Sequence, residues 1–224
     1  MPRIGMVVAT QKEIVPFLKA QNIEIYTYKN KGFDVMEFKM GGNEIVCVRS
    51  GVGEIYAAAA TQLIISEYKV DVMMNFGVCG TLTGKIGIHN VVLIKGVTHY
   101  DFDLSGIDGL PVGKYPDEEI VIKTDDNLRK IARDFMPWLE EVVCASADKF
   151  VSDEKTKMYL SETFGAEVCD MESAAVLLTS KNAGVPCLVV KAVSDGGGAE
   201  EYYKMVHGAT EKYVELIKGI CDRL

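Results

Sequence analysis

The chain has 224 residues, of which 48% are hydrophobic and 25% are charged. This composition is typical of a globular protein with a large core. The 32 acidic residues outnumber the 24 basic ones, and the formal net charge is -8. Such a balance argues against binding to nucleic acid and against a polybasic membrane dock, because both require a basic surface that attracts phosphate groups.

The sequence carries no marks of export or of a membrane span. No apolar run approaches the ~20 residues that a membrane helix requires. The apolar stretch 4–9 is followed at once by polar residues and is too short for a secretory signal, so we expect a cytoplasmic protein. The six cysteines are scattered singly, with no C-x-x-C pair and no histidine cluster nearby, which favours reduced core residues.

Short runs rich in valine, isoleucine and methionine alternate with helical patterns. The first part of the chain predicts a strand, a helix, a three-strand meander with polar turns and a long helix, over residues 4–9, 11–20, 23–28, 33–40, 44–49 and 54–68. The later strands are expected at 72–76, 91–94, 142–147 and 187–193. The later helices are expected at 125–135, 153–164, 171–182 and 200–221.

Several of these strands are apolar on both sides, so helices must cover both faces of the sheet. The sequence therefore predicts an α/β fold with a mostly parallel central sheet, in a single domain over residues 1–224. The segment 99–119 is polar, rich in glycine and about twenty residues long. A loop of this length is usually functional or covered by a partner.

Two glycine-bearing segments are expected where strands end. Ser50-Gly51-Val52-Gly53 separates a strand from a helix and would let a ligand approach backbone N–H groups, and Asn75 to Gly80 follows a buried strand. Neither is a G-x-G-x-x-G fingerprint, and no Walker lysine follows. The two segments either form the floor of one crevice or are unrelated tight turns.

Three acidic residues are expected near the same edge of the sheet. Glu13 follows the first strand, Glu172 begins a helix and Asp195 ends the last strand. Each also has a purely structural interpretation: Glu13 as a solvated glutamate, Glu172 as a carboxylate at a helix start, and Asp195 as an aspartate that forms a turn. Converging on one crevice, they could run acid chemistry on one side of a bond and base chemistry on the other, which is a hydrolase arrangement.

Seven segments, read in chain order, resemble the nucleoside phosphorylase and nucleosidase superfamily, and within it they are most similar to 5′-methylthioadenosine/S-adenosylhomocysteine nucleosidases. They are residues 4–13, 50–53, 75–77, 99–103, 146–150, 171–175 and 194–195. The resemblance implies a three-layer α/β/α fold around a mixed, distorted central sheet, and a homodimer. It also implies hydrolysis of a purine nucleoside that releases adenine without a cofactor or metal, as in methionine salvage.

The resemblance also assigns roles at the reacting bond. Asp195 would be the general acid that protonates purine N7, and Glu13 would hold and deprotonate the attacking water. Glu172 and the backbone of Met171 would bind the ribose hydroxyls. Carboxylates near the sugar suit this reaction, since positive charge develops on the ribosyl ring.

Further contacts with the nucleoside follow from the same resemblance. Phe150 would stack on the purine and Val151 would read its edge, while Phe102 would reach the 5′-substituent pocket of the neighbouring subunit. The remaining predicted substrate contacts are Val52, Val78, Lys191 and Ser194.

Two positions depart from the pattern. The hydrolases that the chain resembles usually carry serine at Val78 and arginine at Lys191, and both positions flank the water site. Valine lacks the hydroxyl group of serine. Lysine carries a single ammonium group in place of the planar guanidinium of arginine, which can make two parallel hydrogen bonds.

Three alternatives remain open: a phosphorylase, a hydrolase of another purine nucleoside such as futalosine, and a nucleoside-binding protein without activity. Glu13 would repel phosphate, and the matched positions hold no cation, although Arg49 could supply one if it points inward. These charges favour water as the nucleophile.

Overall fold

The computed structural model describes residues 1–21, 23–195 and 212–224. Most of the predicted helix 200–221 lies outside the described residues, and its described part, 212–221, is helical. The side chain of Asp195 also lies outside the described part, whereas its backbone is placed at the end of a strand.

The N-terminal half begins with β1 (Arg3–Val8) and α1 (Gln11–Gln21), followed by β2 (Tyr26–Asn30), β3 (Phe33–Met40) and β4 (Asn43–Arg49), then by α2 (Glu54–Leu63), which continues as the π-helical η1 (Ile64–Tyr68). Strands β2, β3 and β4 form the predicted antiparallel meander, with a polar turn at each end of β3. β4 then pairs with β1 in parallel, which joins the meander to the rest of the sheet.

The C-terminal half contains β5 (Val72–Thr81), β6 (Val91–His99), α3 (Ser105–Asp108), β7 (Ile122–Lys123), α4 (Asp126–Phe135), β8 (Glu140–Ser146), α5 (Glu154–Phe164), β9 (Val168–Asp170), α6 (Ser173–Asn182) and β10 (Cys187–Asp195). The sheet order runs β10-β6-β8-β9-β5-β1-β4-β3-β2, and β10 also pairs with β5. Five strands therefore close into a ring, with β1 to β4 extending from it through β5.

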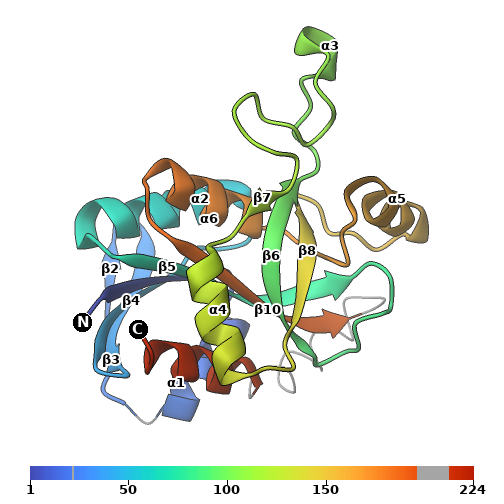
Figure 1. The fold of residues 1–224 in the computed structure, drawn as a ribbon. Helices are drawn as coiled ribbons and strands as arrows, with labels where there is room; N and C mark the ends of the chain where they lie inside the picture. Colours follow the sequence, from blue (N-terminus) through green and yellow to red (C-terminus); the bar gives the residue numbers. More distant parts are fainter. Residues whose placement is uncertain (22, 196–211) are drawn as a thin grey trace.

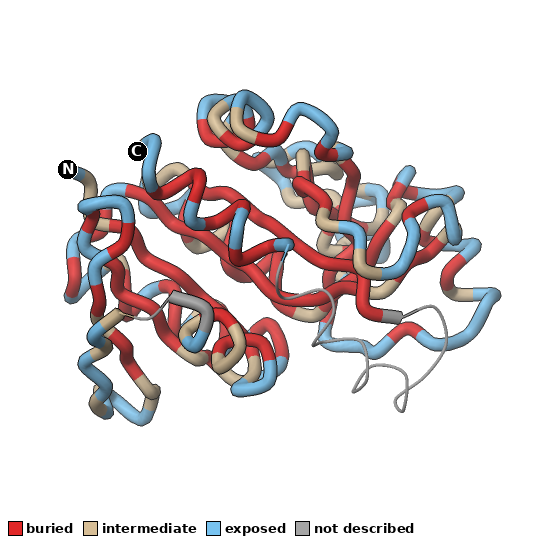
Figure 2. The backbone as a smooth tube through the Cα atoms, turned by 90° about the horizontal axis from the view of Figure 1, so that it is seen from below, coloured by how far each residue is buried: buried red, intermediate tan, exposed pale blue. Residues whose placement is uncertain are grey.

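The strands bury side chains on both faces, as their apolar runs predict. In β10, Leu188 and Val190 belong to one core cluster and Val189 and Val193 to another. Helices α2 and α6 cover one face, while α1, α4 and the helical residues 212–221 cover the other (Figure 1). In Figure 2 the strands between these layers are buried along most of their length. The predicted α/β fold class is confirmed.

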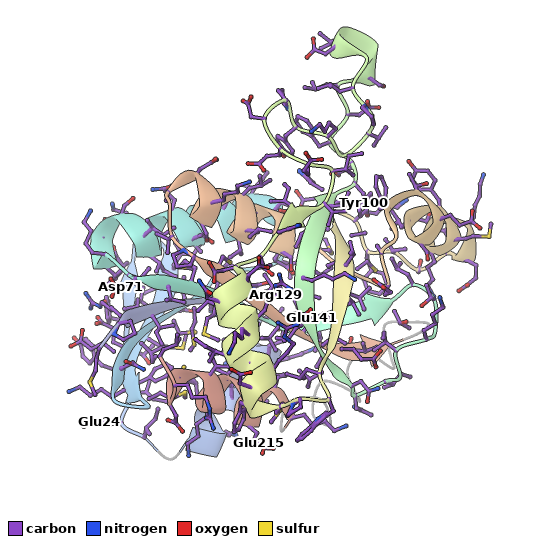
Figure 3. All side chains as sticks on the ribbon, viewed as in Figure 1. Glu24, Asp71, Tyr100, Arg129, Glu141 and Glu215 are labelled. Atoms are coloured by element: carbon purple, nitrogen blue, oxygen red, sulfur yellow. The ribbon has the colours of Figure 1, made fainter. Side chains whose placement is uncertain are left out.

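Polar and aromatic contacts fasten the outer elements to the ring. Arg129 of α4 donates from Nη1 to Oε1 of Glu141 in β8 over 2.8 Å, and both residues are labelled in Figure 3. Segment 100–121 projects from the ring as an arm that carries α3 at its tip (Figure 1). At its base, Phe102 stacks on Tyr115 with ring centroids 3.7 Å apart.

Three predictions about elements need correction. The glycine-bearing segment 75–80 lies within β5, because this strand pairs with β10 as far as Gly80. Strands β6 and β10 also continue beyond their predicted ends. The short strands β7 and β9 were not expected, and only their pairing with β6, β8 and β5 makes them strands.

The cysteines behave as expected, since all six are free and buried. Within the described ranges, no helix is long and apolar enough to cross a membrane.

Candidate active site

The Glu13 carboxylate is buried near the start of α1 and is held from two sides. Its Oε1 accepts a hydrogen bond from the backbone N–H of Val78 over 2.9 Å. Its Oε2 accepts from the backbone N–H of Thr10 over 2.9 Å and from the Thr10 hydroxyl over 2.7 Å. Tyr213 donates to the Glu13 carbonyl over 2.8 Å. Both the backbone and the carboxylate of Glu13 are therefore fixed at the edge of β5.

Gly77 makes room for this carboxylate. Its φ of 150° lies in a region that residues with a side chain rarely adopt. A Cβ atom at this position would lie 2.5 Å from Oε1 of Glu13. The glycine is thus required by the close approach of Glu13 to the strand, which sequence reasoning interpreted as a turn.

Glu172 lies at the N-cap of α6 and is buried. Its Oε1 accepts from the backbone N–H of Gly53 over 3.0 Å, so the first glycine segment reaches the start of α6. Burial raises the pKa of Glu172 to about 7, and the charge of Asp170 adds to this effect, while Lys191 opposes it. The Glu13 charge also raises this pKa, so the two predicted glutamates lie within electrostatic reach of each other.

Behind Glu172, Asp170 and Lys191 form a buried ion pair. Lys191 Nζ lies 2.7 Å from Oδ2 of Asp170, and each side chain is 2% exposed. Burial opposes the charge on Asp170, but the Lys191 ammonium and the Ser173 hydrogen bonds outweigh it and hold the pKa below its usual range. Burial likewise opposes the charge on Lys191, and the surrounding carboxylates, led by Asp170, raise its pKa. The Lys191 ammonium is therefore paired with the Asp170 carboxylate.

Sequence reasoning missed one acidic member of this region. Glu54, the first residue of α2, is 8% exposed. Its Oε1 accepts from the Ser146 hydroxyl over 2.7 Å, and its Oε2 accepts from the backbone N–H of Ala175 over 2.5 Å. The position of Glu54 directly after the Ser50-Gly53 segment could have indicated a site residue. It was not decisive, because a glutamate in the first turn of a helix is common and interacts favourably with the helix dipole.

The other predicted residues fall into three groups. Val78 and Ser194 are buried on the adjacent strands β5 and β10, and the Ser194 hydroxyl donates to the Cys79 carbonyl over 3.4 Å. Val52 and Phe150 are each 52% exposed, in the segments that precede α2 and α5. Val151 and Met171 are adjacent to residues of this site in the sequence, and Val151 is buried.

The last two predicted residues are Phe102 and Asp195. Phe102 lies on the projecting arm, and the hydrogen bonds and ion pairs of the described residues do not link it to Glu13 or Glu172. The Asp195 backbone pairs with Gly80, next to the segment that binds Glu13, but its side chain lies outside the described part. The structure thus brings Glu13, Glu172, Val78 and Lys191 together.

Arg49, which could have supplied a cation for a phosphate, is paired with another residue. Its guanidinium forms an ion pair with Asp34 of the neighbouring strand β3. Within the described ranges, no group of three or more histidine, cysteine or acidic residues is arranged to hold a metal ion.

Fold and site together define an α/β enzyme whose buried carboxylates gather at one edge of a mixed sheet. Residues 3–224 match the family described as the phosphorylase superfamily, and the chain belongs to this superfamily.

Individual relatives within the superfamily are named nucleosidases. An aminodeoxyfutalosine nucleosidase of Campylobacter jejuni is 26% identical over 234 residues, with 100% of both chains covered. A 5′-methylthioadenosine/S-adenosylhomocysteine nucleosidase of Shewanella loihica is 27% identical over 199 residues, with 86% of each chain covered. A crystal structure of the Helicobacter pylori 5′-methylthioadenosine/S-adenosylhomocysteine nucleosidase, complexed with a substituted pyrrolidinol, matches with a TM-score of 0.94 and 26% identity. It covers 100% of this chain and 99% of that chain. The predicted superfamily and the predicted class of enzyme, a nucleosidase, are confirmed.

Proposed function

We propose that this protein hydrolyses the N-glycosidic bond of a purine nucleoside, with 5′-methylthioadenosine or S-adenosylhomocysteine as substrate and adenine as product. The observation that carries the proposal is the Glu13 carboxylate, buried and oriented by three donors from Thr10 and Val78. A carboxylate held in this way is preorganised to orient a water molecule and to accept its proton.

In the proposed reaction, Glu13 holds the attacking water and removes its proton, while Asp195 donates a proton to purine N7 so that the base leaves neutral. The bond between the sugar and the base weakens before the water attacks, and positive charge develops on the ribosyl ring. Nearby carboxylates stabilise this charge. A positioned acid or base contributes typically ~10²–10⁴-fold to the rate.

The remaining predicted residues bind the nucleoside. Glu172 and the backbone of Met171 bind the ribose hydroxyls, and a carboxyl group with a pKa of about 7 can accept or donate a hydrogen bond there. Phe150 stacks on the purine and Val151 reads its edge; the exposure of Phe150 leaves a ring face for such stacking. Val52, Val78, Lys191 and Ser194 complete the predicted lining.

The charges of the site support water over phosphate as nucleophile. A phosphate would have to lie beside Glu13 and Glu172, and two cations that could offset this repulsion are already paired, Lys191 with Asp170 and Arg49 with Asp34. Two negative groups a few ångströms apart repel strongly in a buried site. The reaction therefore needs no cofactor in this proposal.

A second substrate, aminodeoxyfutalosine, is supported by a relative. The Campylobacter jejuni relative is named an aminodeoxyfutalosine nucleosidase. Both candidates share the ribosyl–purine bond, so the same carboxylates serve either one.

We also propose that the protein acts as a homodimer in the cytoplasm. The arm 100–121 projects from the ring, and Ile107 near its tip is 82% exposed. A large apolar side chain on a projecting arm suits burial against a second copy, where Phe102 would approach the partner's substrate.

The test is an assay of the purified protein with 5′-methylthioadenosine, S-adenosylhomocysteine, aminodeoxyfutalosine, adenosine and inosine, with and without phosphate, following free base. We expect base release that does not depend on phosphate. Phosphate-dependent turnover that yields ribose 1-phosphate would contradict the proposal, and so would nucleoside binding without turnover.

The general acid is tested by D195N. The rate on the preferred nucleoside should fall ~10²–10⁴-fold, with little change in folding stability, because the amide keeps the size of the side chain but has no acidic proton to give. A matched control is D134N, in an exposed ion pair with Lys130 on α4, which should leave the rate unchanged. A near-normal rate in D195N would remove Asp195 from this role.

A further inference from the structure

Glu54 connects three elements of the site that are far apart in the sequence. It begins α2, its Oε1 contacts the Ser146 hydroxyl at the end of β8, and its Oε2 accepts from the Ala175 N–H in the first turn of α6. Ser146 itself accepts from the Ala174 N–H over 3.1 Å. A single buried carboxyl group thus organises the start of α6.

The contacts between the two helix starts are reciprocal. Gly53 donates its N–H to the Glu172 carboxylate, and the next residue, Glu54, accepts from Ala175, three residues after Glu172. Asp148 fixes the other side of this joint by accepting from the Glu54 N–H over 2.7 Å. The position of the Glu172 carboxylate therefore depends on where α2 begins, and the Glu54 side chain hydrogen-bonds the start of α2 to the first turn of α6.

Charged and titratable groups surround Glu54 from every side. They are Asp170 and Glu172 at the start of α6, Lys191 behind Asp170, Asp148 at its N–H, and Tyr100 and Tyr115 at the base of the arm. Tyr100 is labelled near the end of β6 in Figure 3, and its hydroxyl is buried without a hydrogen-bond partner among the described residues.

Burial raises the pKa of Glu54 to about 8, and the neighbouring Asp170 and Glu172 charges add to this effect against the Ser146 and Ala175 hydrogen bonds. Near neutral pH the carboxyl group therefore keeps its proton. In that form Oε2 still accepts from Ala175, and a proton on Oε1 would reverse the contact with Ser146, whose hydroxyl donates to Oε1 in the structure. The serine hydroxyl is then free to donate to Asp170, with which it is also hydrogen-bonded.

We propose that Glu54 is a positioning residue for Glu172: its carboxyl group locks the start of α2 to the first turn of α6 and so fixes the Glu172 carboxylate against the Gly53 amide. The catalytic consequence rests on the proposed function, which assigns Glu172 to the ribose hydroxyls. Loss of this lock loosens substrate binding while Glu13 stays in place, since the hydrogen bonds to the Glu13 carboxylate come from Thr10 and Val78.

The test compares E54A and E54Q with a matched control, E154A. Glu154 is likewise the first residue of a helix, α5, but it is exposed. E54A should raise KM for the preferred nucleoside roughly tenfold, with a smaller change in kcat. E54Q should restore KM to within about twofold of the wild type, because its amide can accept from Ala175 and donate to Ser146. E154A should match the wild type.

An unchanged KM in E54A overturns the proposal, and so does an E54Q variant as impaired as E54A. If E54A does not fold, S146A removes one partner of Glu54 and should raise KM severalfold; an unchanged KM in S146A then overturns it.

A second readout does not depend on catalysis. Amide hydrogen exchange in the protein without substrate should show faster exchange at Gly53 in E54A and unchanged exchange in E154A. If the wild type cleaves no nucleoside, the proposed function fails, and the exchange at Gly53 still decides on Glu54. Unchanged exchange there in E54A overturns the positioning role.

Discussion

Helices α2 and α5 both begin with a glutamate, but the two glutamates have different surroundings. Each has a glutamate at its first position and an aspartate that binds an amide of the first turn: Asp148 accepts from Glu54, and Asp153 accepts from Thr156 over 2.8 Å. The Glu154 side chain is 86% exposed and pairs with Lys157. Glu54 is enclosed among Ser146, Ala175 and the charges of Asp170 and Glu172.

This difference in surroundings decides the charge of each helix start. Hydrogen bonds from Thr156 lower the pKa of Asp153, so the start of α5 is anionic in neutral solution. Burial raises the pKa of Glu54 to about 8, so the buried glutamate at the start of α2 carries a proton. Burial and neighbouring charges, rather than residue type, set the protonation state of each carboxyl group. Because a protonated carboxyl group carries no charge, several such groups can lie close together in the candidate site.

Removing the buried cation Lys191 should have the largest effect on stability. K191M leaves Asp170 buried without its partner, which should lower the free energy of unfolding by about 3–5 kcal/mol. At the start of α5, E154Q removes the charge of a carboxylate that is 86% exposed, although its partner Lys157 is buried, and should cost at most ~1 kcal/mol. Urea unfolding at pH 7 measures both, and equal losses would show that burial does not separate the two regions.

The pH dependence of stability also distinguishes the two helix starts. Between pH 4.5 and 8 the folded protein holds a proton on Glu54 that the unfolded chain has released, so stability falls as the pH rises through this range. Each such group contributes a slope of up to about 1.4 kcal/mol per pH unit. Glu172 acts in the same sense between pH 4.5 and 7.

E54Q should remove the Glu54 contribution to this slope. Urea unfolding at pH 5, 6, 7 and 8 gives the slopes of the wild type and of E54Q. Parallel curves for the wild type and E54Q would contradict a protonated Glu54.

The smallest expected effect is at the start of α5. D153A removes the acceptor for the Thr156 N–H and should lower Tm by roughly 2–4 °C. Calorimetry measures the loss, and the nucleosidase rate should not change, because α5 contributes none of the buried carboxylates. A large loss of activity would mean that the two helix starts are coupled.

Much of the fold was predictable because its strands and helices carry strong local patterns. The meander, α2 and the alternating faces of β10 follow from apolar periodicity and polar turns. The ring could not be predicted, because β9 is three residues long and becomes a strand only by pairing with β5 and β8. The same non-local pairing extends β5 through Gly77, where the local sequence indicates a turn.

The site was predictable to a similar degree. Glu13 and Glu172 lie where the sequence predicts, near glycines that make room for them or donate to them. The roles assigned to them, and to Asp195, remain predictions. Glu54 and the pairing of Asp170 with Lys191 were missed, because they depend on β8, β9 and β10 meeting in space.

The closure of the ring has a consequence for biosynthesis. Lys191 arrives with β10, the last strand of the ring to leave the ribosome, and its ammonium neutralises Asp170 of the earlier β9. Before β10 docks, a nascent chain would have to bury the Asp170 charge unaided, which is strongly unfavourable. Vectorial synthesis therefore delays the neutralisation of Asp170 until β10 has emerged, after the other four strands of the ring.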